Sequence, residues 1–136
     1  MTKIFRATKE DFDGTGNYFE TSQAYTDTPT LYMTARPDTL IQGILKRVHW
    51  RLNPSNAVTY QLYLFSDAVA DNYGSEMAKI FDSTDVVALG ADDTEYDAEV
   101  TTPFKLASPG KIYYLITWSG APGDTLGYIE ASGERE

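Results

Sequence analysis

The 136 residues include 11 Lys and Arg and 20 Asp and Glu, and the resulting net charge of −9 repels phosphate backbones and anionic lipid surfaces. The hydrophobic fraction of 42%, with 10 Tyr, 6 Phe and 2 Trp, is sufficient to bury one core, and the absence of cysteine excludes disulfides, thiol catalysis and thiolate metal sites. We therefore expect one acidic domain over residues 1–136 that binds neither nucleic acid nor a membrane.

The N-terminal region predicts a short strand and then a polar arm. Residues 3–7 are strand-like, whereas residues 10–29 are rich in Asp, Gly, Thr, Asn and Ser and carry isolated aromatic residues. The start of the chain lacks the apolar stretch of a signal peptide, and no apolar run approaches the ~18 residues needed to span a bilayer. We expect a soluble product that is made in the cytoplasm without a signal peptide.

The next two predicted strands cover residues 30–35 and 39–52, and the turn sequence Arg36-Pro37-Asp38 separates them. The longer strand alternates between a basic face and an apolar face, although Gln42 and Lys46 interrupt the apolar one. The basic face carries Arg47, His49 and Arg51, and the apolar face carries Leu40, Ile44, Val48, Trp50 and Leu52. We expect the apolar face to line the core.

The middle of the chain predicts two further strands and one ambiguous segment. A turn at residues 53–56 leads into a strand over residues 57–66, and residues 67–75 form a loop. Residues 76–82 fit either one turn of helix or a strand, and we favour the strand. A short strand or connector follows at residues 86–89.

The last third of the chain predicts four strands. Residues 94–101 alternate apolar and acidic side chains, which is typical of a half-solvated strand, and residues 103–106, 111–119 and 126–131 complete the set. Clusters of Pro, Gly, Ser and Ala separate the last three. We expect the polar residues 133–136 to fray as a short flexible tail.

Turn signals therefore recur along the whole chain, and no segment has the period of an amphipathic helix. About 8–10 short strands in this arrangement predict an all-β fold, an antiparallel β-sandwich with jelly-roll or related Greek-key topology. A closed barrel is the alternative. Neither an internal repeat nor a linker divides the chain, which again favours a single domain.

One segment of the arm has part of the pattern of a calcium-binding loop. Asp11, Asp13 and Asn17 occupy the first, third and a later oxygen-donor position, and a glycine stands at the sixth. Position twelve is Ser22 instead of the bidentate carboxylate, and no helical pattern flanks the loop. We favour a plain Asp/Gly turn and expect no cofactor, with calcium left as the single candidate metal.

A second acidic cluster lies on the predicted strand over residues 94–101. Glu95, Asp97 and Glu99 share one face of this strand, so that the opposite face can line the core. Such carboxylates could bind calcium or form the carboxylate pair of a glycosidase. We favour the interpretation that they are solvated or paired with Arg47 and Arg51 across strands.

No motif in the sequence indicates catalysis. His49 is the single histidine, it lies on the polar face of its strand, and no Gly-x-Ser-x-Gly elbow accompanies it. Phosphate-binding and dinucleotide-binding glycine motifs are absent too. We therefore expect that the protein is not an enzyme.

Two strands are apolar on both faces. Tyr63 and Phe65 oppose the core face of one, and Tyr113 and Leu115 oppose the core face of the other. A loop, a neighbouring subunit or a ligand could cover these side chains, which makes them interface candidates. The alternative is a sugar platform, for which the candidate aromatic residues are Tyr18, Tyr73 and Trp118.

The segments Gly110–Gly120, Gly127-Tyr128-Ile129 and Tyr60–Asp67 resemble virion β-sandwich proteins of tailed phages and related viruses. The resemblance covers about half of the chain, and carbohydrate-binding sandwich modules have a similar sequence texture. It implies a small, non-enzymatic structural component of a virion, such as a capsid decoration protein or part of a fibre, made in the host cytoplasm. No functional residue carries over from it.

Two functions follow as hypotheses. The first is a viral structural protein that forms a homo-oligomer or docks on a capsid protein, since a polar arm can cross to a neighbour and an unpaired sheet edge can accept it. The second is a glycan-binding module that recognises sugars through exposed aromatic residues.

Overall fold

The computed structural model describes residues 3–7, 32–35, 42–66, 79–88, 94–106, 111–120 and 125–135. These residues form strands and loops, and they include no helix long and apolar enough to cross a membrane. The nine strands are β1 (Lys3–Ala7), β2 (Tyr32–Ala35), β3 (Gln42–Pro54), β4 (Val58–Phe65), β5 (Lys79–Asp82), β6 (Val86–Ala88), β7 (Tyr96–Lys105), β8 (Lys111–Trp118) and β9 (Thr125–Arg135). The predicted all-β class is confirmed, and the described part of the ambiguous segment, residues 79–82, is a strand.

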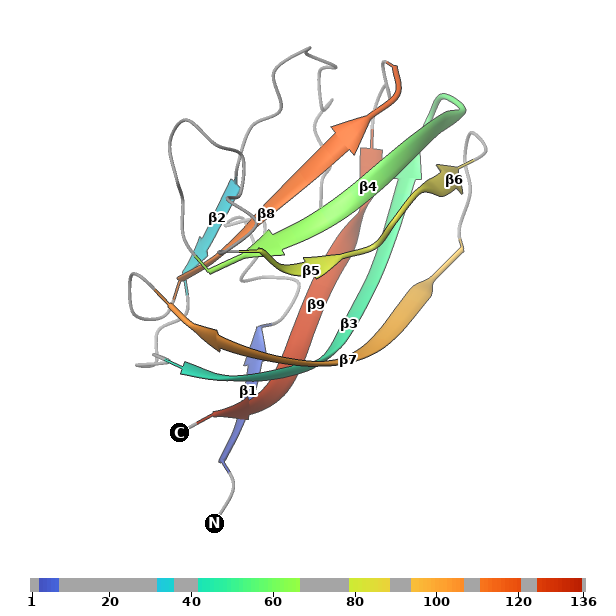
Figure 1. The fold of residues 1–136 in the computed structure, drawn as a ribbon. Helices are drawn as coiled ribbons and strands as arrows, with labels where there is room; N and C mark the ends of the chain where they lie inside the picture. The colour runs from blue at the N-terminus through green and yellow to red at the C-terminus, as the bar shows by residue number, and fades with distance from the viewer. Residues whose placement is uncertain are drawn as a thin grey trace.

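The strands form two antiparallel sheets that pack face to face (Figure 1). The first sheet has the order β1-β9-β3-β7, and the second has the order β2-β8-β4-β5, with β6 also paired to β4. Strands distant in sequence are neighbours in both sheets, because β9 lies beside β1 and β8 lies beside β2. This nested order is compatible with the jelly-roll or Greek-key class expected from the sequence.

Alternate side chains of each strand fill the space between the sheets, as the period of two requires. On β4 the buried positions alternate with half-buried ones along most of the strand. A hydrogen bond joins the sheets through the core, since Trp50 Nε1 on β3 donates to the Tyr60 hydroxyl on β4 at 3.0 Å. Among the described residues, the largest fully buried side chains are Tyr60, Phe5, Leu45, Leu52, Leu62, Leu64, Ile112, Ile129 and Val48 in this core, and Phe65 in a separate cluster with Tyr63 and Tyr113.

The expected alternation of β3 fails at its start because the strand contains a bulge. The register shifts between Leu45 and Arg47, so Lys46 is an extra residue and Leu45, instead of Ile44, is buried. From Leu45 to Arg47 the β3 chain moves on by two residues. Over the same interval the paired positions move by one residue on β9 and by three residues on β7. The backbone path between these positions thus lengthens from β9 to β7, and Figure 1 shows that β3 and β7 curve strongly.

Two predicted strand ends were wrong, both at prolines. β3 continues through Pro54, so the turn that was expected from residue 53 is confined to the residues after the proline. β7 is one strand across Pro103, where the sequence predicted two. A proline is tolerated in these places because an edge strand or a strand end leaves one backbone side without a ladder partner.

The C-terminal residues 133–135 were expected to fray, and this prediction was wrong. They are the last residues of β9, where Gly133 pairs with Phe5 of β1 and with Leu45 of β3. A side chain at Gly133 would lie 2.9 Å from the Phe5 ring, so the glycine makes room for that ring in the core. The ring of Phe5 in turn packs edge-on against the ring of Phe104, with the ring centroids 5.4 Å apart.

Candidate functional site

The face of the first sheet that points away from the core, here called the outer face, carries the densest set of titratable side chains. His49 Nε2 lies 2.9 Å from the Tyr128 hydroxyl, and that hydroxyl donates a short hydrogen bond to Glu95 Oε1. Because the Tyr128 proton is committed to Glu95, the network is satisfied when His49 Nε2 carries a proton and donates it to the Tyr128 oxygen. His49 of β3, Tyr128 of β9 and Glu95, which directly precedes β7, thus form one chain of hydrogen bonds.

The other ring nitrogen of His49 faces a second carboxylate. His49 Nδ1 is buried without a hydrogen-bond partner and lies 3.9 Å from Asp97 Oδ2. The Tyr128 ring stacks on the imidazole with ring centroids 5.5 Å apart. The Arg51 guanidinium carbon lies 5.8 Å from the centroid of the Tyr128 ring. The imidazole can therefore hold one proton on Nε2 and offers a second site on Nδ1 toward Asp97.

Asp97 is also bound by an arginine, as the alternation of the two strands had predicted. Arg47 Nε donates to both carboxylate oxygens of Asp97 at 2.8 and 3.0 Å, and Arg47 Nη2 contacts Oδ2. This hydrogen-bonded guanidinium holds the pKa of Asp97 below its usual range. The same bond raises the pKa of Arg47. Arg51, the other predicted partner, lies at the Tyr128 ring.

Tyr128 has the largest change in acidity on this face. Burial, followed by its hydrogen bond to Glu95 and the charge of that carboxylate, raises the pKa of Tyr128 to about 12. The phenol consequently stays protonated at neutral pH and acts as the donor to Glu95. Among the residues that the structure describes, no group of three His, Asp or Glu side chains has the geometry of a metal site.

A hollow of about 310 Å³ lies on the outer face between β1, β9 and β3. Arg6, Arg47 and Glu130 contribute charge to its walls, and Ile4 contributes an apolar side. Arg6 Nη2 and Glu130 Oε2 are 3.8 Å apart, and the Arg6 side chain remains 67% exposed. Arg6 is therefore largely solvated, whereas the Glu130 side chain is half-buried.

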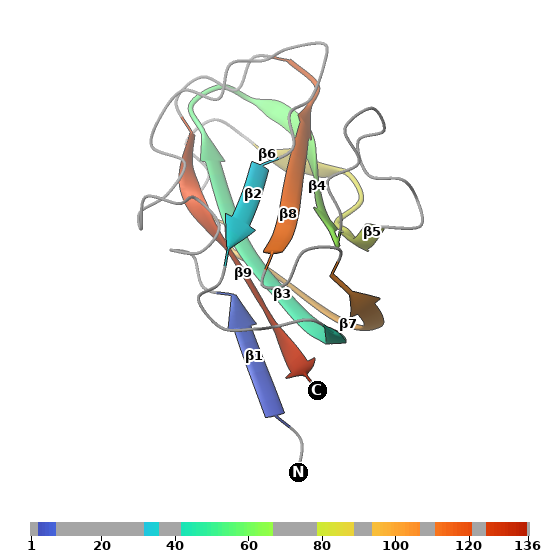
Figure 2. The same ribbon diagram turned by 90° about the vertical axis from the view of Figure 1, so that its left-hand side faces the viewer.

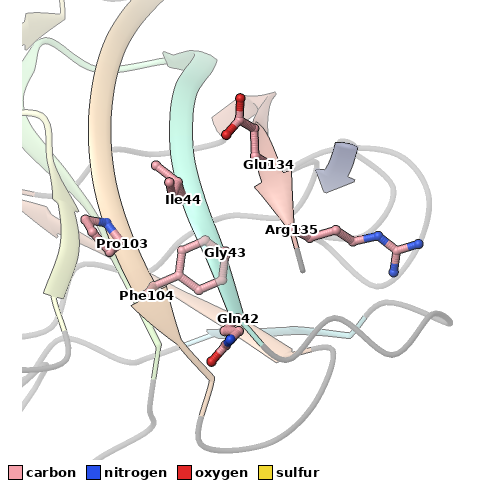
Figure 3. A pocket seen from close by; sticks show the side chains of 7 residues that line it. All are labelled: Gln42, Gly43, Ile44, Pro103, Phe104, Glu134 and Arg135. Carbon is pink, nitrogen blue, oxygen red and sulfur yellow. The ribbon is translucent and has the colours of Figure 1, made fainter. Parts of the chain in front are cut away.

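A second hollow, of about 490 Å³, lies near the end of the first sheet (Figure 3). It is lined by residues of β3, β7 and β9, among them Gly43, Phe104 and Pro103. In Figure 3 the Phe104 ring lies across β3 at Gly43, whereas the side chain of Arg135 extends away from that ring. A side chain at Gly43 would approach the backbone oxygen of Glu134 within 2.2 Å, which explains the glycine.

Three of the four predicted interface residues lie together on the far face of the second sheet. Tyr63 and Tyr113 pack against Phe65, and the rings of Tyr63 and Phe65 stack with centroids 6.1 Å apart. Leu115 occupies the register position opposite Tyr63 on β8. Phe65 is only 1% exposed within the single chain, so at this residue the chain itself supplies the cover.

Polar groups border this aromatic cluster. The Tyr63 hydroxyl donates to Gln61 Oε1 at 2.7 Å, and Lys79 Nζ lies 5.9 Å from the Tyr63 ring centroid and 3.4 Å from Asp82 Oδ2. Burial raises the pKa of Tyr63, and the nearby Asp82 charge adds to the effect. Of these contacts only the approach of Lys79 to Tyr63 joins different strands, β5 and β4, and strand periodicity alone does not predict that pairing.

The remaining predicted site residues are mostly outside the described residues. Tyr18, Tyr73, Asp11, Asp13 and Asn17 all fall there. Trp118 is described, and it is the last residue of β8 rather than part of a loop. Its ring packs against Tyr60 with centroids 5.5 Å apart, and it borders the main core while remaining partly accessible.

The two outer strands of the first sheet form exposed edges in the described part of the chain. β1 pairs only with β9, and β7 pairs only with β3. Figure 2 shows β1 and β7 on opposite sides of the sheet, with β9 and β3 between them. Ile4 of β1 is 77% exposed, and within the described ranges Val87 of β6, at 66%, is the other exposed large apolar side chain.

No family model matches the sequence, and no curated protein is significantly similar to it. Solved structures nevertheless share the fold. A protein of the T13 IBDV viral particle matches 99% of this chain with a TM-score of 0.55 and 8% identity. Dimeric latent PorU from Porphyromonas gingivalis matches 99% of this chain with a TM-score of 0.50 and 12% identity.

The chain spans 31% of the viral protein and 13% of PorU, and at these identities the likeness is one of fold. TmCBM61, solved in complex with beta-1,4-galactotriose, covers 98% of this chain with 16% identity, but its TM-score of 0.38 is too low to argue from. The fold neighbours therefore include a component of a viral particle.

Proposed function

We propose that the chain is a non-enzymatic structural component of a virion, such as a capsid decoration or fibre protein, acting through self-association or by docking on a capsid lattice. The observation that carries this proposal is the fold, which matches a protein of the T13 IBDV viral particle over 99% of this chain. Double-sheet sandwiches recur in viral capsids, where their flat sides and edges are suited to repeated contacts.

The polar side chains of the outer face support a structural role. His49, Tyr128 and Glu95 bind one another, and Arg47 binds Asp97, so these groups tie β3, β7 and β9 together. Each such cross-strand pair contributes a fraction of a kcal/mol, roughly 0.2–1 kcal/mol, to the sheet. The same groups would have to give up these partners to act on a substrate.

Of the two modes, self-association has the more direct geometric support. β1 and β7 each have one neighbour among the described strands, and an edge strand is a template for another chain. The exposed Ile4 lies on one of these edges. We place the protein in the virion, with a second copy or a capsid protein as its partner.

Electron microscopy of the concentrated, negatively stained protein tests this proposal. Ordered rings, fibres or sheets are expected. If only dispersed single molecules are seen, co-sedimentation with particles of the virus that encodes the chain tests the docking mode. Absence of both ordered assemblies and particle binding would contradict the proposed function.

Glycan binding is the second candidate, and the partly accessible indole of Trp118 favours it. Aromatic rings bind sugars by stacking on their apolar faces. A glycan array would identify a ligand, and Tyr73→Ala should weaken its binding if the predicted platform is correct. An array without a reproducible ligand counts against this candidate.

A further inference from the structure

We propose that copies of this chain associate head to tail, with the β1 edge of one copy pairing with the β7 edge of the next. The four-stranded sheet then continues from molecule to molecule. The inference rests on the proposed function, because it specifies how the self-association would occur. Its occupant is a second copy of the same chain, and the argument for that occupant is the charge and direction of the two edges.

The directions of the two edge strands and the orientation of the outer face both permit this contact. All neighbours in β1-β9-β3-β7 are antiparallel, so β1 and β7 run in opposite directions within one sheet. A copy moved sideways therefore presents its β1 antiparallel to the β7 of the first copy. The outer face of one sheet also continues as the outer face of the next, as an extended sheet requires.

The two edges carry opposite charge. The β1 sequence KIFRA contains two cations and no anion, whereas the outer face of β7 carries Asp97 and Glu99. Pairing β1 with a second β1, or β7 with a second β7, would bring like charges together, which is unfavourable across strands. Charge therefore favours the pairing of β1 with β7 over the pairing of β1 with β1 or of β7 with β7.

One register satisfies both the charges and the backbone. With Arg6 opposite Glu99, the exposed Ile4 lies opposite Thr101, and all four side chains point to the outer face. The paired stretch of β7 then ends before Pro103, whose nitrogen cannot donate to a ladder. A shift of two residues toward Pro103 would place that proline opposite Ile4.

The two charged residues of this register are available. Arg6 is 67% exposed, and its distance of 3.8 Å to Glu130 makes that ion pair a weak competitor. Glu99 is exposed and lies opposite Arg47 of β3, but that guanidinium binds Asp97 and forms no ion pair with Glu99 among the described residues. An open hollow of about 590 Å³, lined by Lys46, Arg47, Glu99, Val100 and Thr101, leaves space beside this stretch of β7.

A head-to-tail contact does not stop at two copies. Each molecule keeps one free edge after the first contact, so the assembly grows into a ring or an open chain. The paired stretch is short, and a single contact is therefore expected to be weak. Repetition on a lattice would strengthen it through effective concentration.

Charge reversal tests the pairing in solution. Arg6→Glu and Glu99→Lys should each weaken association, measured by sedimentation velocity, by on the order of tenfold, because each places like charges opposite one another. Mixing the two variants should restore association, since the acidic β1 of one meets the basic β7 of the other. The double variant within one chain should restore it too.

Matched controls separate the pairing from net charge. Lys105→Glu changes the net charge as Arg6→Glu does, but it lies beyond the paired stretch of β7. Asp85→Lys changes the net charge as Glu99→Lys does, from an exposed position between β5 and β6. Neither control should alter the association constant, and circular dichroism should show that all variants stay folded.

Disulfide trapping tests the register, and the cysteine-free chain gives a clean background. Ile4→Cys with Thr101→Cys should form a ladder of covalent oligomers under mild oxidation. Ile4→Cys with Lys105→Cys, out of register, should not. Within one chain β1 and β7 are separated by three strand spacings of ~4.8 Å, beyond disulfide reach, so every cross-link joins two molecules.

The outcomes separate this inference from the proposed function. Growth beyond a dimer, its loss on each reversal, its recovery on mixing and an in-register ladder would support the edge pairing. Association that ignores the reversals would overturn the pairing and leave the proposed function standing. A wild-type chain that remains monomeric and gives no ladder would also overturn it, and the particle-binding experiment would then decide the proposed function.

Discussion

Trp50 and Tyr60 form a side-chain hydrogen bond that crosses the core between the sheets. Tyr60→Phe keeps the ring but leaves the buried Trp50 N–H without this acceptor. We expect the free energy of unfolding to fall by about 1–3 kcal/mol, the cost of an unsatisfied buried donor. Urea denaturation followed by tryptophan fluorescence measures the change.

Tyr63→Phe is the matched control for this prediction. It removes a hydroxyl that donates to Gln61 at a half-buried site on the far face of the second sheet. Water can replace the lost partner there, so the loss should be smaller, below about 1 kcal/mol. Equal losses in both variants would show that the bond between the sheets has no special role.

Tyr128 makes the stability of the fold sensitive to high pH. The fold raises its pKa to about 12, above the ~10 of an unfolded tyrosine, because burial and Glu95 disfavour the phenolate. This contribution to stability is complete below pH ~10 and is lost as the pH rises through the folded pKa. Ultraviolet titration of the wild type minus Tyr128→Phe should isolate one late-titrating phenol, and Glu95→Gln should lower its pKa.

At the residue scale the sequence predicted contacts within a face and missed contacts between distant strands. Alternation placed Arg47 and Asp97 on the polar faces of their strands, and the structure confirms that they pair. The link from His49 through Tyr128 to Glu95 was missed, because nothing local indicates that β9 lies next to β3. Sheet order is a property of the whole chain.

Gly127 of β9 occupies a position where the backbone conformation and the close approach of β3 both favour glycine. Gly127 lies at a φ of +155°, and a side chain there would approach the Arg51 carbonyl oxygen within 1.9 Å. Gly127→Ala should therefore destabilise the fold by about 1–3 kcal/mol or more, through overpacking and backbone strain. Thermal unfolding by calorimetry measures the loss.

Gly120→Ala provides the control for this change. Gly120 has no atom within 4 Å of the added carbon, so the substitution should change stability by less than ~0.5 kcal/mol. A similar loss at both glycines would mean that the close approach of β3 and β9 does not account for Gly127.

At the element scale, strands with strong alternation were predicted well and their irregularities were not. β4 and β8 were located within a residue or so, since β-branched and aromatic residues fill both. The bulge at Lys46 was visible only as a polar interruption, and its meaning requires the register with β9. The strand break predicted before Pro103 was wrong, because a proline ends most strands but is tolerated in an edge strand such as β7.

At the scale of the molecule, net charge opposes the contact that we propose while local charge favours it. The net charge of −9 repels a second copy over long distances. At physiological salt the Debye length is ~8 Å, so this repulsion is screened while contacting pairs such as Arg6 and Glu99 persist. Association should therefore be stronger at moderate salt than in the absence of salt, and it should decline again at molar salt.

Sedimentation at three salt concentrations checks this dependence. A steady decline from no salt upward would indicate that local ion pairs outweigh the whole-molecule repulsion at every distance. A steady rise would indicate contacts driven by apolar surface, and Ile4→Ser would then test the exposed apolar residue of β1.

The central claim is that this β-sandwich is a self-associating structural protein. The most direct measurement is its molar mass by light scattering during size exclusion, from micromolar to near-millimolar concentration. We predict that the mass rises from the 15.2 kDa of a single chain and passes beyond that of a dimer. A mass that stays at the single-chain value at every concentration would contradict the claim.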